Sequence, residues 1–117
     1  MFFEIDFSDV PFKATSTGPS ADEHIQDVGL RATTLTLVAR IVALEKSAPS
    51  PSVTISLETS RDPVEGKWFP LGDFNPMSGP DDFDKRDFDG LLRYVRWNVT
   101  DLTNISFTSF MIFGVAR

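Results

Sequence analysis

The chain has 117 residues and no cysteine, and its 17 acidic and 11 basic side chains give a formal net charge of −6 at pH 7. This length predicts one domain, which can bury a core without disulfides or a structural metal. The lack of cysteine excludes disulfide frameworks, thiolate zinc sites and thiol nucleophiles. The acidic balance argues against binding to nucleic-acid phosphates. No apolar run approaches the ~20 residues that span a bilayer, and the acidic start lacks the basic region of a secretory signal, so we expect no membrane partner.

The first 29 residues differ in pattern from the rest of the chain. Large apolar residues come first, and a polar tract over residues 13–23 follows them. Either an N-terminal strand docks on its own domain and a loop follows, or an arm reaches a groove in a neighbouring subunit by strand addition. We therefore divide the chain into an N-terminal arm or docking strand with a polar loop (1–29) and a β-sandwich domain (30–117). Exposed phenylalanines favour association, so the candidate partner-binding residues of the arm are Phe2, Phe3, Ile5, Phe7 and Phe12.

Alternating apolar and polar residues predict several strands. In residues 53–60 and 92–100 every second residue is apolar, which is typical of a strand with one wet face. Residues 30–44 could form an amphipathic helix, but their many β-branched side chains favour one long strand. Residues 105–115 are apolar on both faces, which predicts a strand that is central or covered by a partner. Residues 68–74 are broken by Pro70, as in an edge strand.

These strands and the Pro-rich, Ser-rich loops between them predict the fold class. We expect an all-β chain forming a single antiparallel β-sandwich, jelly-roll or discoidin-like, with an N-terminal arm. The residues expected to be buried between its two sheets are Ile55, Leu57, Val95, Trp97, Phe107 and Phe113.

The acidic segment over residues 81–90 contains five carboxylates in nine residues, and carboxylate oxygens are ligands that calcium prefers. The spacing is not that of an EF-hand, and Lys85 and Arg86 interrupt the acidic run. We favour a solvated loop that Phe83 and Phe88 anchor to the core. Calcium is the alternative, with Asp82, Asp84, Asp87 and Asp89 as its candidate ligands.

No constellation in the sequence predicts catalysis, so we expect no enzyme activity and no cofactor. His24 is the only histidine and lies in a polar, loop-like stretch, and no Gly-x-Ser-x-Gly motif occurs. Among the aromatic residues, Trp97 alternates with core positions, whereas Trp68 lies near a loop. A Trp ring offers a flat apolar face with a polar edge, so Trp68 is a possible ligand-binding residue.

Residues 53–74 resemble a pattern found in discoidin-like β-sandwiches, in which a strand ends in a Ser-x-Asp-Gly-x-x-Trp turn and a short strand ending in Phe follows. Ser60, Asp62, Gly66, Trp68 and Phe74 stand in those places, and the turn is two residues longer. The Arg-Tyr-Val-Arg sequence at residues 93–96 is similar to a later strand of the family, and residues 106–117 are similar to its closing strand. Discoidin domains are longer and carry flanking cysteines and calcium-loop residues that this chain lacks.

The compact, cysteine-free form resembles small accessory proteins of tailed-bacteriophage virions, including capsid decoration proteins. That resemblance implies a structural role in a virion assembled in the bacterial cytoplasm. It also implies a homo-oligomer that contacts the major capsid protein or other virion subunits. The alternative is a carbohydrate-binding module that uses surface aromatics such as Trp68 to bind glycans. A monomer that binds glycans would favour the module, and a chain that associates with assembled shells would favour decoration.

Overall fold

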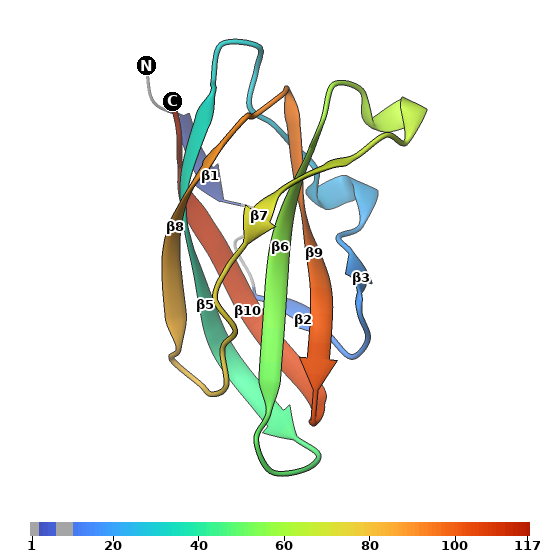
Figure 1. Ribbon diagram of the computed structural model, residues 1–117, viewed down its shortest axis with the longest axis vertical. Helices are drawn as coiled ribbons and strands as arrows, with labels where there is room; N and C mark the ends of the chain where they lie inside the picture. The colour runs from blue at the N-terminus through green and yellow to red at the C-terminus, as the bar shows by residue number, and fades with distance from the viewer. Residues whose placement is uncertain (1–2, 7–10) are drawn as a thin grey trace.

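The computed structural model describes residues 3–6 and 11–117 and consists of two antiparallel sheets packed as a sandwich (Figure 1). The strands of the first sheet are β1 (Phe3–Asp6), β2 (Phe12–Ala14), β5 (Thr34–Lys46), β8 (Phe83–Asp89) and β10 (Ile105–Ala116). Their order across the sheet is β1-β10-β5-β8, and β2 also pairs with β10. The strands of the second sheet are β3 (Gly18–Pro19), β4 (Gln26–Asp27), β6 (Ser52–Ser60), β7 (Phe69–Asp73) and β9 (Tyr94–Thr103). Their order across the sheet is β3-β9-β6-β7, and β4 also pairs with β9. Two 3-10 turns, η1 (Asp22–His24) and η2 (Pro63–Glu65), lie in its connections. The all-β antiparallel sandwich predicted from the sequence is confirmed.

The long strand predicted over residues 30–44 is observed as β5, which begins at Thr34. Leu35, Leu37, Ala39 and Ile41 are fully buried, and the residues that alternate with them are more exposed, so the period is that of a strand rather than a helix. In the part of the chain that the structure describes, no helix has the length and apolar character needed to cross a membrane.

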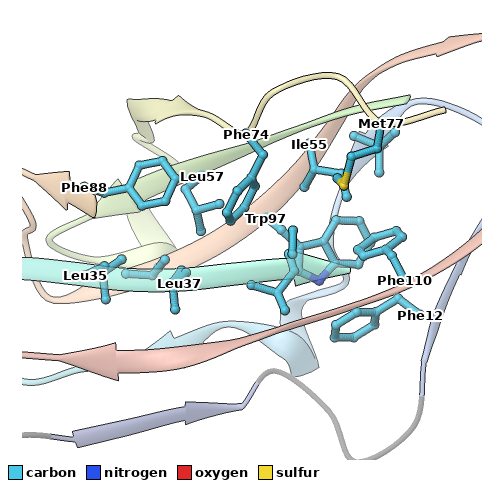
Figure 2. Packing of buried hydrophobic residues seen from close by; sticks show 14 of the residues in the cluster. Phe12, Leu35, Leu37, Ile55, Leu57, Phe74, Met77, Phe88, Trp97 and Phe110 are labelled. Carbon is cyan, nitrogen blue, oxygen red and sulfur yellow. The ribbon is translucent and has the colours of Figure 1, made fainter. Parts of the chain in front are cut away.

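The N-terminal segment contributes strands to both sheets of its own sandwich. Phe3 pairs with Ala116 and Ile5 with Gly114 in the register of β1 on β10. Phe12, which we expected in a partner-binding arm, is instead buried, with its ring centroid 5.0 Å from that of Trp97 and 5.6 Å from that of Phe110. Figure 2 shows these three rings packed together. Phe2 and Phe7 lie outside the described residues.

The core lies between the inner faces of the two sheets. Ile55, Leu57, Val95 and Trp97 are buried, as predicted. The prediction for Phe107 and Phe113 is wrong, because both lie on the outer side of β10. The inner side of that strand is formed by Thr108, Phe110 and Ile112. Because β10 is apolar on both faces, alternation alone does not show which face is buried.

The acidic segment is not a solvated loop, as we expected, but forms β8, an edge strand paired with β5. Phe88 is buried and lies edge-on to Phe74, with 5.3 Å between ring centroids (Figure 2). Phe83 does not anchor the segment, because 70% of its surface is exposed. The predicted edge strand that contains Pro70 is present as β7, with a register shift between Leu57 and Glu58 of its partner β6.

Candidate interaction surface

The outer side of the first sheet carries a band of apolar side chains that no other part of the described chain covers with a second layer. We call it the β5–β10 face, and its residues are Val38, Val42, Phe83, Phe107, Met111, Phe113 and Val115. Phe113 lies directly opposite Val38, and Met111 lies opposite Arg40, which in turn is opposite Phe83. Phe113 is 41% exposed and Val42 is 37% exposed, and the other members except Phe83 are half-buried. The band therefore runs along β10 with Val38 and Val42 of β5 beside it, and Arg40 separates Met111 from Phe83 on β8.

Charged side chains surround this band. Lys13 Nζ lies 6.0 Å from the Phe107 ring centroid, and Arg40 donates to Asp81 at 2.8 Å. Thr36 donates to Asp87 at 2.6 Å. Among side chains that the structure describes, the rim holds Lys13, Arg40, Lys85 and Arg117 against Glu45, Asp81, Asp87 and Asp89. In the register of β1 on β10, Glu4 pairs with Val115 and Asp6 with Phe113, so with these two the acidic residues along the face outnumber the basic ones by six to four.

An apolar centre within a polar rim is the anatomy of a protein–protein interface. Contiguous exposed apolar patches on soluble domains mark interaction sites. Neither nucleophile nor base lies within the band itself, which is made of hydrocarbon and thioether groups. The band is therefore suited to binding the surface of another protein.

A second cluster lies on the outer side of the other sheet, around Trp68. The Arg96 guanidinium carbon lies 4.2 Å from the Trp68 ring centroid. Arg96 Nε donates to Glu58 Oε1 at 2.7 Å, and Asn98 Nδ2 donates to Glu58 Oε2 at 3.4 Å. The guanidinium covers one face of the half-buried indole and leaves its remaining surface beside charged hydrogen-bonding groups. The sequence singled out Trp68 but not Arg96 or Glu58, whose positions depend on the register of β9 on β6.

The four calcium candidates are not brought together. Alternation along β8 places Asp84 on the opposite side of the strand from Asp87 and Asp89. All four carboxylates accept hydrogen bonds: Asp84 from the Asn75 N–H at 2.7 Å, Asp82 from the N–H groups of residues 78 and 79, and Asp87 and Asp89 from the hydroxyls of Thr36 and Thr34. Over residues 3–6 and 11–117, no group of three or more His or carboxylate side chains converges to hold a metal ion.

A bidentate ion pair between Asp27 and Arg93 was not anticipated. Arg93 Nε and Nη2 donate to the two carboxylate oxygens of Asp27 at 3.1 and 3.0 Å. The pair joins β4 to the residue before β9, 66 positions later in sequence. These hydrogen bonds from Arg93 lower the pKa of Asp27, and the Gly29 N–H adds to the effect, while Asp27 raises the pKa of Arg93. Groups so far apart in sequence give no local signal of their pairing.

Two buried polar atoms lie where the N-terminal segment closes one side of the sandwich. Trp97 Nε1 and Ser20 Oγ are buried, and neither has a hydrogen-bond partner among the described residues. His24 lies edge-on to Phe12, with 4.8 Å between ring centroids. The sole histidine is thus placed against an aromatic core residue.

The chain matches no protein-family model, and no curated protein is similar to it in sequence.

Proposed function

We propose that this chain is a non-enzymatic structural protein that assembles with other subunits of a phage-type virion through its β5–β10 face. Its place is on the capsid shell, which it decorates or stabilises, and its partners are the major capsid protein or other virion subunits. The virion assignment rests on the resemblance of the compact, cysteine-free chain to small phage accessory proteins. The assembly role rests on the apolar β5–β10 face.

The energetics of this face support association. Burying one Phe side chain contributes about 1.5–3 kcal/mol. Phe83 and Phe113 both present apolar surface to solvent, together with the shared band of aliphatic and Met side chains. A partner that covers the band removes this surface from water. None of the band's residues belongs to the core cluster between the two sheets.

Co-sedimentation with capsid shells tests the proposal. The shells would be those of the virion to which we propose the protein belongs, assembled from its major capsid protein. We expect the wild-type protein to sediment with the shells and Phe113→Asp to remain in the supernatant. Phe69→Asp is the matched control, because Phe69 is a 53% exposed phenylalanine on the other sheet and its loss should leave binding unchanged. Equal binding by all three proteins would contradict the proposed surface, and no binding by any of them would contradict the virion role.

The cluster around Trp68 favours a second candidate function, that of a carbohydrate-binding module. A partly exposed indole beside the Arg96–Glu58 pair and Asn98 offers both a stacking surface and hydrogen-bonding groups for a sugar. A glycan array distinguishes the two functions. Glycan binding that disappears in Trp68→Ala but survives in Phe113→Asp would favour the module.

A further inference from the structure

We propose that a pocket beside Trp97 binds a small neutral compound that carries a flat apolar ring and an oxygen atom able to accept a hydrogen bond. The pocket lies between β2 of the first sheet and the segment of β3 and η1 that follows it in the chain. None of the apolar residues of the β5–β10 face lines it. The pocket would therefore bind its ligand whether or not the protein belongs to a virion.

The pocket has the size and the lining of a small-molecule site. Its volume is about 390 Å³, near the lower end of the ~300–1,000 Å³ typical of ligand pockets. Five of its seven lining residues carry rings: Pro11, Phe12, Pro19, His24 and Trp97. Flat rings pack well against other flat rings. A wall of this kind around so small a volume favours a compound with a single ring.

The lining also favours a neutral ligand. Lys13 is the only Lys, Arg, Asp or Glu among the described residues that line the pocket. Its Nζ lies 6.0 Å from the Phe107 ring centroid, and the residue is exposed between the buried Phe12 and Ala14, so its charge lies on the other side of β2. An ionised ligand would leave water without gaining an opposite charge, which costs free energy.

The Trp97 indole supplies a hydrogen-bond donor without a partner. Trp97 is only 7% exposed, and its Nε1 is buried with no acceptor among the described residues. Figure 2 shows this nitrogen on the side of the ring that faces Phe12, which forms another wall of the pocket. An indole N–H can only donate, so the ligand must bring an acceptor. Because an unpaired buried donor costs free energy, an acceptor placed there stabilises the complex.

Ser20 places a second unpartnered polar atom on the same side of the core. Its N–H donates to the Trp97 carbonyl at 2.8 Å, and its Oγ is buried without a partner. No other buried side-chain nitrogen or oxygen in the described part of the chain lacks a hydrogen bond. Unsatisfied buried polar groups in native proteins call for a missing partner. Since both lie beside one ring-lined pocket, the geometry points to a ligand that brings the missing oxygen.

The indole N–H signals in a nitrogen–proton correlation spectrum test the proposal. The chain has two tryptophans, and Trp68→Phe identifies which signal belongs to Trp97. Benzamide has both the ring and the acceptor, toluene has only the ring, and acetamide has only the acceptor. We expect benzamide to move the Trp97 signal downfield, as a new hydrogen bond does, and to leave the Trp68 signal in place. Toluene and acetamide should move the Trp97 signal much less.

Filling the pocket tests its location. Ala21 is exposed and lines the pocket at the start of η1. We expect Ala21→Leu to abolish the benzamide-induced shift and to retain the wild-type circular dichroism spectrum. Ala48→Leu is the matched control, because it adds the same side chain in the loop between β5 and β6 and should bind benzamide as wild type does.

Removing the donor tests the role of Nε1. Trp97→Phe retains a ring in the core and lacks the N–H. Loss of one hydrogen bond should weaken benzamide binding about two- to tenfold, measured by saturation transfer to the benzamide protons. Toluene should bind Trp97→Phe and wild type equally.

Three results would overturn the proposal. The first is a Trp97 signal that benzamide does not move at any concentration up to its solubility limit. The second is an equal shift with toluene, since the N–H would then not be donating to the ligand. The third is benzamide binding by Ala21→Leu as tight as that by Ala48→Leu, which would place the compound elsewhere on the protein. Sedimentation with capsid shells is expected to be the same for both of these variants.

Discussion

Gly114 lies in β10 directly opposite Leu37 of β5. A Cβ atom built there would overlap the Thr36 carbonyl oxygen and come within 2.9 Å of Leu37 Cα. Backbone atoms cannot move aside as a flexible side chain can. We expect Gly114→Ala to lower the free energy of unfolding by at least the ~1–3 kcal/mol typical of overpacking.

Urea denaturation measures this effect, and Gly79→Ala is the matched control. No atom lies within 4 Å of a Cβ built at Gly79. That variant should therefore unfold at nearly the wild-type midpoint. If Gly114→Ala and Gly79→Ala unfold at the same urea concentration, β10 and β5 accommodate a Cβ atom at position 114 without losing stability.

Trp97 is the central aromatic residue of the core, in contact with both Phe12 and Phe110. Truncation of a buried Trp to Ala costs about 3–5 kcal/mol through lost burial and the cavity that remains. We expect a loss of this size for Trp97→Ala in denaturant melts. Trp68→Ala, which removes the other tryptophan from the outer surface, should cost much less, and a larger loss at Trp68 than at Trp97 would contradict the assignment of faces.

The Asp27–Arg93 pair predicts a pH dependence. Arg93 holds the pKa of Asp27 below its ordinary value of 3.8, so the folded state favours the ionised carboxylate. The stabilisation is present above pH 3.8 and disappears as the pH falls through the lower pKa of the folded state. Both side chains are over 40% exposed, so the contribution is small and decreases with added salt.

The thermal stabilities of wild type and Asp27→Asn, measured across a range of pH, test this. We expect wild type to be the more stable near neutral pH and the difference to vanish in strong acid. If the difference in stability between wild type and Asp27→Asn stays constant with pH, the substitution acts through something other than the charge of Asp27.

Among the strands, β1 pairs with β10 in the first sheet through four residues. Deleting residues 1–6 removes this pairing and exposes the hydrogen-bonding groups of the β10 edge. We expect the truncated protein to melt at a lower temperature than wild type. If the truncated protein is as stable as wild type but no longer assembles, residues 1–6 bind a partner, as the arm interpretation predicts.

β8 is the other edge strand of that sheet, and its carboxylates already accept hydrogen bonds from neighbouring strands and loops. Because they point to opposite sides, no calcium site forms from them, and a ligand that does not bind cannot raise the melting temperature. We expect the melting temperature to be the same in excess calcium and in excess chelator. A shift of several degrees on chelation would restore calcium as a ligand of Asp82, Asp84, Asp87 or Asp89.

At the scale of the whole molecule, alternation predicted β6 and β9, β-branched side chains favoured β5 over a helix, and Pro70 indicated the edge strand β7. These strands and the loops between them predicted the antiparallel sandwich. It failed where local pattern carries no information about pairing. β10 is apolar on both sides, so the burial of Phe110 rather than Phe113 depends on the sheet that it joins. β8 is so rich in charge that only its partner β5 reveals it as a strand.

The candidate surface was harder to predict than the fold. The two-faced strand at residues 105–115 indicated a central strand or a covering partner, and β10 proves to be central while still exposing Phe113. The contribution of Phe83 and Val38 to the same band depends on which strands lie beside one another. Long-range register sets that arrangement, as it sets the meeting of Arg96 with Trp68 and of Arg93 with Asp27.

The position of β10 in the chain has a consequence for the way the protein is made. β5 is synthesised early, yet its main partner in the sheet is the last strand, and the two pair from Ile105 with Lys46 to Ala116 with Leu35. While the ribosome is still adding residues 47–104, the apolar side of β5 has no β10 beside it. Contacts of such long sequence separation form slowly, and unfinished sheets expose apolar surface and open edges. The nascent chain must therefore remain protected from aggregation until residue 116 has left the exit tunnel, and only then can the first sheet close.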